Sequence, residues 1–174
     1  MYDLIVVGGG PAGLTCAAFL AKAGAEVTIY EKNNYLGGLL VYGIPEFRLP
    51  KHIVKSTIQK ILDLGIEVKY NKKIGQDVTL KELENKYDFV FLAFGANVSL
   101  KMGIEGEYLE GVYGANELLE YNCHPKYEGK TVLVNGGGNV AIDVARTVKR
   151  LGAKDVIIVY RREEEQMPAE DKEV

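Results

Sequence analysis

The sequence predicts an α/β fold made of two units, each with a parallel sheet. In residues 4–30, and again in 131–160, a short apolar run leads into three glycines, an apolar helical stretch and a second apolar run. Such a strand–turn–helix–strand pattern, about 30 residues long, joins parallel strands by a right-handed crossover. The 174 residues are 47% hydrophobic and 26% charged, with 20 glycines. This balance is typical of a folded globular protein and excludes a disordered or low-complexity chain.

The first half of the chain contains one of these units. Apolar runs at 4–7 and 26–30 predict two buried strands, and the stretch 11–23, ended by Gly24, predicts the helix between them. Residues 33–50 are rich in Gly, Tyr and Pro, which predicts a loop. The remaining elements that we expect are helices at 52–64 and 80–85 and strands at 68–70 and 88–94.

The second half repeats the pattern after a weakly patterned stretch. Residues 97–130 predict polar turns around one helix at 115–121. Strands are then expected at 131–134 and 156–160, with a helix at 139–151 between them. We therefore expect three parts, of which the third is incomplete: a first domain at 1–97, a connecting segment at 98–129 and the beginning of a second domain at 130–174.

Charge and cysteine content exclude several classes of function. The net charge is −3, which gives no electrostatic case for binding nucleic acid or an anionic membrane. No apolar run approaches the roughly 20 residues of a membrane span, and the N-terminus lacks the features of a signal peptide. Cys16 and Cys123 have no metal-ligand spacing, so we expect no metal site and a reducing, cytoplasmic setting. Exposed sheet edges favour a homo-oligomer.

The first glycine loop has the pattern G-x-G-x-x-G at residues 8–13. Gly8 suits the tight turn after the strand, Gly10 lets a diphosphate approach the backbone, and Gly13 lets the helix pack on the strand. The free N–H groups at the helix start then face the phosphates. Glu31 ends the second strand, where a carboxylate can accept hydrogen bonds from ribose hydroxyls. The alternative is a glycine-rich turn with a surface glutamate.

The second glycine loop, residues 136–141, reads G-x-G-x-x-A and has the same context. Its second strand ends in Tyr160-Arg161-Arg162 instead of an acid. Guanidinium groups bind a 2′-phosphate through charge-assisted hydrogen bonds, which favours NADP over NAD. The alternative is that both arginines are solvated and neutralised by the acids at 163–165.

Together the loops predict two Rossmann-like βαβ dinucleotide-binding units. Two dinucleotide sites in one chain indicate electron transfer between two cofactors. The first, with Glu31, suits FAD, and the second suits a nicotinamide. No side chain is a convincing acid, base or nucleophile, so we expect the cofactors to carry the chemistry.

Longer motifs resemble a known family over essentially the whole chain. They are the first βαβ unit, the second βαβ unit with Met167-Pro168-Ala169, and the block GGLLVYGIPEFRLP at 37–50, which generic flavin reductases lack. These segments resemble the small (beta) subunit of NADPH-dependent glutamate synthase. The wider group includes the flavin portion of dihydropyrimidine dehydrogenase and the flavin subunit of ferredoxin:NADP transhydrogenases.

The resemblance implies a set of cofactor-binding residues. Those implied for FAD are Gly8, Gly10, Pro11, Ala12 and Gly13 at the diphosphate, Glu31 and Lys32 at the ribose, Gly38, Leu39 and Arg48 toward the flavin, and Ile74 at the adenine. For Arg48 a structural salt bridge is the alternative. Those implied for NADPH are Gly136, Gly138, Asn139, Val140 and Ala141, with Arg161 and Arg162 on the 2′-phosphate.

The resemblance also implies a function. NADPH would reduce FAD, and electrons would pass through iron–sulfur clusters to a large glutamate synthase subunit or a ferredoxin-type acceptor, for glutamate synthesis from glutamine and 2-oxoglutarate. The family's cysteine-rich segment and its C-terminal Gly-Asp are absent from these residues, and two cysteines cannot hold a cluster. We therefore expect a truncated fragment. The alternatives are a flavin subunit of an NADPH:ferredoxin complex and an inactive nucleotide-binding fragment without flavin.

Overall fold

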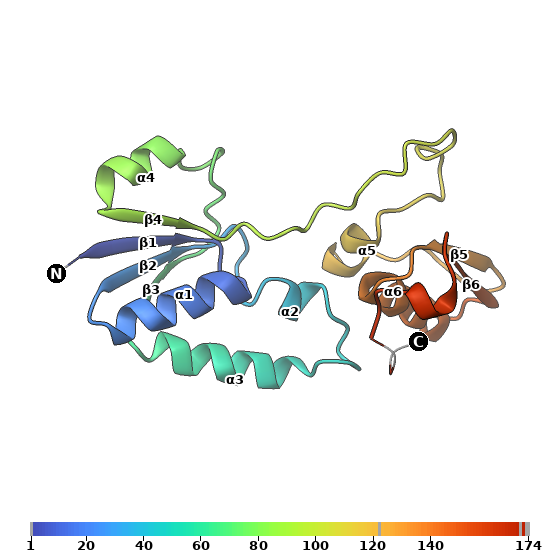
Figure 1. The fold of residues 1–174 in the computed structure, drawn as a ribbon, viewed down its shortest axis with the longest axis horizontal. Coiled ribbons are helices and arrows are strands. Elements are labelled where there is room, and N and C mark those ends of the chain that lie inside the picture. Colours follow the sequence, from blue (N-terminus) through green and yellow to red (C-terminus); the bar gives the residue numbers. More distant parts are fainter. Residues whose placement is uncertain (1, 122, 171, 173–174) are drawn as a thin grey trace. The chain divides into compact units, whose positions relative to one another are not determined.

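The computed structural model describes residues 2–121, 123–170 and 172. Residues 1, 122, 171 and 173–174 lie outside the described residues. These residues belong to the first domain, the connecting segment and the second domain that the sequence predicts. The chain divides into two compact units (Figure 1). Unit 1 comprises residues 1–41 and 46–96, and unit 2 comprises residues 42–45 and 97–174.

Unit 1 is built on a four-stranded parallel sheet in the order β3-β2-β1-β4. The strands are β1 (Asp3–Val7), β2 (Glu26–Tyr30), β3 (Glu67–Lys69) and β4 (Phe89–Leu92). Val7, the last residue of β1, lies opposite Tyr30 on one side and Leu92 on the other. The carboxyl ends of the central strands therefore meet at one edge of the sheet, where the glycine loop begins.

Helices cover both faces of this sheet (Figure 1). They are α1 (Pro11–Lys22) and α3 (Lys51–Leu62) on one face and α4 (Leu80–Lys86) on the other. The short helix α2 (Leu39–Tyr42) lies between α1 and α3 in the sequence. Because side chains alternate along a strand, Val6 and Ile29 pack with α1 and α3, whereas Ile5 and Tyr30 pack against Leu83 of α4. Coverage on both faces is the usual arrangement of a parallel sheet and explains its continuous apolar strands.

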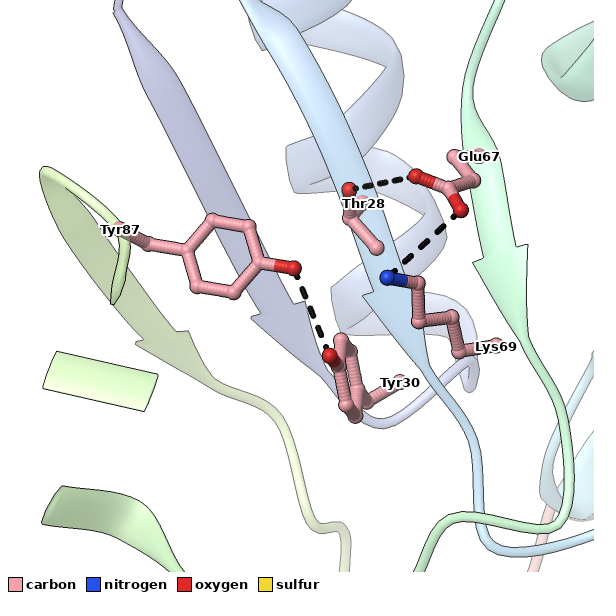
Figure 2. Close-up of polar contacts among 5 residues, drawn as sticks. All are labelled: Thr28, Tyr30, Glu67, Lys69 and Tyr87. Atoms are coloured by element: carbon pink, nitrogen blue, oxygen red, sulfur yellow. Dashed lines mark hydrogen bonds and ion pairs between the residues drawn. The ribbon is translucent and has the colours of Figure 1, made fainter. Parts of the chain in front are cut away.

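Polar side chains tie the end of β2 to its neighbours (Figure 2). The hydroxyls of Tyr30 and Tyr87 lie 3.4 Å apart, and the Thr28 hydroxyl donates to Glu67 at 3.3 Å. Glu67 in turn pairs with Lys69 at 3.7 Å. Burial, followed by the hydrogen bond with Tyr87, raises the pKa of Tyr30, so the phenol stays neutral and able to donate. These contacts fix the backbone directly before Glu31.

Unit 2 contains a two-stranded parallel sheet of β5 (Thr131–Asn135) and β6 (Asp155–Val159). The helices of unit 2 are α5 (Ala115–Tyr121), α6 (Asn139–Arg150) and a short 3₁₀ helix, η1 (Glu164–Gln166). One face of the sheet packs on α6, where Val134 and Val148 are buried. On strand positions of the opposite parity, Leu133 is 67% exposed and Ile157 is 47% exposed.

The structure confirms the predicted α/β fold and its parallel strands, and most element bounds agree within one or two residues. Three local differences are informative. The predicted strand 88–94 is shorter, and its apolar side chains at Phe89 and Phe91 are exposed because β4 is an edge strand. The segment 33–50, predicted as a loop, contains the one-turn helix α2. The third strand begins at Glu67 and ends before Tyr70. Among the described residues, no helix is long and apolar enough to cross a membrane.

Candidate functional site

The turn between β1 and α1 brings three glycines into different roles. Gly8 has φ +104°, which L side chains rarely adopt, and its N–H donates to the Tyr30 carbonyl at 2.8 Å. A Cβ on Gly13 would overlap the carbonyl oxygen of Gly8. These two glycines are therefore required by the turn itself, as the motif predicts.

Gly10 differs because nothing in the chain requires its missing side chain. Its φ is −79°, and the nearest atom to an added Cβ is Gly38 Cα at 3.9 Å. Gly10 is also the N-cap of α1, with no side-chain cap and no acidic residue in the first helical turn. No acidic residue in the first helical turn offsets the positive end of the helix dipole, which favours an anion at this place.

Glu31 is buried and binds the glycine loop directly. Its Oε2 accepts a hydrogen bond from the N–H of Gly9 at 2.7 Å, and its Oε1 accepts one from the N–H of Asn33 at 2.8 Å. The side chain is 5% exposed, so the alternative of a surface glutamate is wrong. Beside it, the side-chain Nδ2 of Asn33 is buried with no hydrogen-bond partner among the described residues.

A second segment of unit 1 packs on the same loop. The N–H of Gly37 donates to the carbonyl of Gly9 at 2.8 Å. A Cβ on Gly38 would come within 2.9 Å of Gly10 Cα, and Gly38 has φ +52°. The approach therefore requires glycine at position 38 but not at position 10, and the two backbones form two walls of one cradle.

The turn between β5 and α6 repeats this construction. Gly136 has φ +140°, and its N–H donates to the Val159 carbonyl at 2.9 Å, as Gly8 does to Tyr30. Gly138 is the N-cap of α6, has φ −96°, and again has no side-chain cap or acidic first turn. The nearest atom to an added Cβ on Gly138 is Pro168 Cγ at 3.9 Å. The two strand–turn–helix motifs thus form as the sequence predicts.

Tyr160 stands in the second turn where Glu31 stands in the first. Both residues directly follow the second strand, and both contact the middle glycine of the loop. A Cβ on Gly137 would lie 2.8–2.9 Å from the Tyr160 ring, so the ring packs against that backbone. Arg161 and Arg162 follow and are exposed.

The segment at 166–170 packs on the second loop as Gly37 and Gly38 pack on the first. The N–H of Ala169 donates to the Gly137 carbonyl at 3.1 Å. The N–H of Glu170 donates to Asn139 Oδ1, also at 3.1 Å. The predicted site residue Asn139 therefore uses its side chain to hold this segment.

The other predicted site residues lie around these loops or apart from them. Lys72 N–H donates to the Glu31 carbonyl at 2.9 Å, which brings the turn preceding Ile74 to the end of β2. Arg48 lies half-buried between α2 and α3. Exposed and accessible to a ligand are Pro11, Ala12, Lys32, Leu39 and Val140, whereas Ala141 is buried.

Both cysteines and His124 are outside the set of predicted cofactor-binding residues. Cys16 is half-buried in α1 and burial raises its pKa, whereas Cys123 is exposed. His124 contacts the Tyr127 hydroxyl at 3.0 Å. Within residues 2–121, 123–170 and 172, no group of three or more His, Cys, Asp or Glu is arranged to hold a metal.

Sequence patterns do not indicate the residues that act through their backbone, nor the role of Tyr160, which stands in the second unit where Glu31 stands in the first. Gly9, Gly37 and Ala169 contribute backbone hydrogen bonds, which no side-chain pattern indicates. Tyr160 was recognised only as a residue that is not acidic. Aligning the two βαβ units on their first glycines would have placed Tyr160 near Glu31 and given the signal.

Comparison with known proteins agrees with this geometry. The family model described as pyridine nucleotide-disulphide oxidoreductase matches residues 2–174. The beta subunit of NADP(+)-dependent formate dehydrogenase from Moorella thermoacetica is 43% identical over 97% of this chain. The small chain of NADPH glutamate synthase from Escherichia coli is 40% identical, also over 97%, which confirms the predicted resemblance. The chain spans 25% and 39% of these two relatives, respectively.

A solved structure shares the fold. FprA from Mycobacterium tuberculosis, in complex with NADPH, matches 99% of this chain with a TM-score of 0.89 and 26% sequence identity. The match covers 46% of the FprA chain. The likeness therefore extends over both units described above.

Proposed function

The chain belongs to the pyridine nucleotide-disulphide oxidoreductase family, and from this premise we propose that it is an oxidoreductase module in which NADPH reduces FAD. The observation that carries the proposal is the pair of matching cradles, each formed by a glycine N-cap and a segment packed opposite it. One chain with two dinucleotide cradles is suited to pass electrons from one nucleotide to another.

The residues at both cradles fit a dinucleotide. Gly10 and Gly138 have ordinary φ values, and among the described residues the nearest non-neighbouring atom to a Cβ on either would be 3.9 Å away. Glycine is therefore not needed there for folding, and the space that a Cβ would fill is available to a diphosphate oxygen. Uncapped N–H groups at the start of α1 and α6 supply the donors.

We assign FAD to the first cradle, within the proposed domain 1–97. The residues that would hold it are Gly8, Gly10, Pro11, Ala12 and Gly13 at the diphosphate, Glu31 and Lys32 at the ribose, Gly38, Leu39 and Arg48 toward the flavin, and the backbone near Ile74 at the adenine. Glu31 already accepts two backbone hydrogen bonds, and each carboxylate oxygen has a second lone pair for a ribose hydroxyl. Glu31 would thus orient the loop and the ribose together.

We assign NADPH to the second cradle, within the proposed domain 130–174. The residues that would hold it are Gly136, Gly138, Asn139, Val140 and Ala141, with Arg161 and Arg162 on the 2′-phosphate. Tyr160 supports this choice, because an aromatic ring occupies the position where a carboxylate would repel that phosphate. Both arginines are exposed and accessible to it.

The bound cofactors supply the hydride chemistry, and the chain's residues bind, orient and shield them. The finer function that we propose is the supply of electrons for glutamate synthesis, with a large glutamate synthase subunit as partner. The resemblance to the glutamate synthase small chain supports it. A second candidate is the flavin subunit of an NADPH:ferredoxin-type complex, and the comparable identity to the beta subunit of an NADP(+)-dependent formate dehydrogenase supports a partner other than a glutamate synthase subunit.

Nucleotide titrations of the 174-residue chain test the proposal. FAD binding is followed by absorbance near 450 nm and by quenching of flavin fluorescence, and NADP⁺ and NAD⁺ binding by calorimetry. We expect FAD to bind and NADP⁺ to bind more tightly than NAD⁺. If neither FAD nor NADP⁺ binds, the chain is a nucleotide-fold fragment without this function.

A further inference from the structure

The segment at 166–170, here called the strap, is attached to the second glycine loop at three points. The N–H of Ala169 donates to the Gly137 carbonyl, and the N–H of Glu170 donates to Asn139 Oδ1. The third attachment is Tyr160, whose hydroxyl donates to the Gln166 carbonyl at 3.1 Å. Ala169 is 7% exposed although Gln166, Pro168 and Glu170 around it are exposed, so the strap is anchored at its middle.

Tyr160 links the strap to the loop through both ends of its side chain. The ring packs on Gly137, and the hydroxyl reaches the residue at which η1 ends. Because Tyr160 directly follows β6, its backbone is set by the sheet. The side chain therefore holds both the strap and the glycine loop at a fixed place relative to the sheet.

The same wall exists in unit 1, where it is built differently. Gly37 N–H donates to the middle glycine's carbonyl there, as Ala169 N–H does in unit 2. Gly38 Cα lies 3.9 Å from the place of a Gly10 Cβ, and Pro168 Cγ lies 3.9 Å from the place of a Gly138 Cβ. Two unrelated segments thus reach the same position over the two N-cap glycines, one with a bare backbone and one with a proline ring.

We propose that the strap is the second wall of the nucleotide diphosphate cradle in unit 2 and that Tyr160 is the positioning residue that holds it there. This inference rests on the proposed function, because it takes the second cradle to be a dinucleotide site. Loss of the strap's attachment would loosen the wall beside the diphosphate. It would leave the contact of Arg161 and Arg162 with a 2′-phosphate unchanged.

Two ligands separate these effects in the 174-residue chain. NADP⁺ carries both the diphosphate and the 2′-phosphate, whereas adenosine 2′-monophosphate carries only the latter. Tyr160→Phe removes the hydroxyl and keeps the ring, Tyr160→Ala removes both, and Ala169→Pro removes the N–H that binds Gly137. Tyr108→Phe is the matched control, because Tyr108 is 83% exposed in the same unit.

We expect the dissociation constant of NADP⁺ to rise about five- to tenfold in Tyr160→Ala and Ala169→Pro, and about two- to threefold in Tyr160→Phe. Binding of adenosine 2′-monophosphate should stay within about twofold in every variant, since its contacts do not involve the strap. Tyr108→Phe should bind both ligands as the parent chain does. Should Tyr160→Ala fail to fold, Tyr160→Phe and Ala169→Pro still decide the question.

A measurement without nucleotide tests the positioning role directly. Amide exchange at Ala169 should be slow in the parent chain and in Tyr108→Phe, and faster in Tyr160→Phe. The proposed role of the strap would be wrong if the variants lost affinity for both ligands equally. It would also be wrong if both NADP⁺ binding and amide exchange at Ala169 stayed unchanged. Failure of the parent chain to bind NADP⁺ would instead overturn the proposed function and the strap with it.

Discussion

The carboxylate of Glu31 accepts a 2.7 Å hydrogen bond from the backbone N–H of Gly9, and this bond joins the end of β2 to the glycine loop that follows β1. The two residues are 22 positions apart in the sequence. The bond is buried, so neither group can exchange its partner for water at low cost. Glu31 therefore has a structural role in the turn before any ribose is considered.

Replacing Glu31 by glutamine should weaken unit 1 and its FAD site together. The amide can present one oxygen as acceptor, but its NH₂ group must then face a backbone N–H of Gly9 or Asn33. We expect Glu31→Gln to lower the free energy of unfolding by about 1–3 kcal/mol in urea titrations and to weaken FAD binding. Glu26→Gln, at the exposed first position of β2, should leave both unchanged. Unchanged unfolding in Glu31→Gln would show that the two hydrogen bonds do not stabilise the turn.

Two alanine substitutions in one loop should separate folding from binding. Gly10→Ala adds a methyl group whose nearest non-neighbouring atom in the described part of the chain is Gly38 Cα at 3.9 Å, so the free energy of unfolding should change by less than about 1 kcal/mol. FAD affinity should fall at least about tenfold, because the methyl occupies the approach of the diphosphate. Gly13→Ala overlaps the Gly8 carbonyl and should destabilise the chain by about 1–3 kcal/mol. A Gly10→Ala protein that binds FAD normally would contradict the assigned cradle.

Removing both arginines after Tyr160 should change nucleotide preference more than nucleotide binding in general. In the double variant Arg161→Ala, Arg162→Ala, NADP⁺ binding should weaken by about 1.5–3 kcal/mol through lost charge-assisted hydrogen bonds. NAD⁺ binding, measured by the same calorimetry, should change much less. Lys126→Ala, an exposed cation of unit 2, is the control for net charge. Equal weakening of NADP⁺ and NAD⁺ would mean that the arginines do not contact the 2′-phosphate.

Thermal stability should fall as the pH decreases from 7.5 to 5.5. Burial lowers the pKa of His124 in the folded chain, whereas in the unfolded chain it titrates at about 6.5. The unfolded state therefore binds the proton first, so the stabilising contribution is complete above about pH 6.5 and is lost as pH falls through the folded-state pKa. His124→Gln should flatten this dependence, and His52→Gln, at an exposed position, should retain it. A slope that persists in His124→Gln would assign it to other groups.

The sequence predicted the strands, helices and both glycine turns because each is encoded locally. Apolar runs, helix periods and glycines next to them are read within one element. The contacts that could not be predicted depend on residues that are distant in the sequence. Glu31 could be placed at a strand end, but its bonds to Gly9 and Asn33 follow from the parallel pairing of β1 and β2.

The exposure of side chains on β4 and the attachment of the strap also could not be predicted from local sequence patterns. The run at 88–94 is predicted as a continuous apolar strand, yet β4 lies at the sheet edge, where Phe89 is 57% exposed. The strap contains the motif Met167-Pro168-Ala169, but that motif does not indicate what the strap binds, because its attachments use the backbone of Ala169 and Glu170. Tyr160 is informative only when the two units are superimposed.

The contact between Gly38 and Gly10 limits how the first loop can be reused in protein engineering. Residues 8–13 transplanted into another Rossmann-like protein would bring the turn but not the backbone that faces it. That facing residue, Gly38, lies 28 positions after Gly10, and it has no side chain that would mark it as part of the site. A chimera would therefore have to carry residues 8–38 as one block. Libraries that randomise either glycine should be screened with the other held fixed.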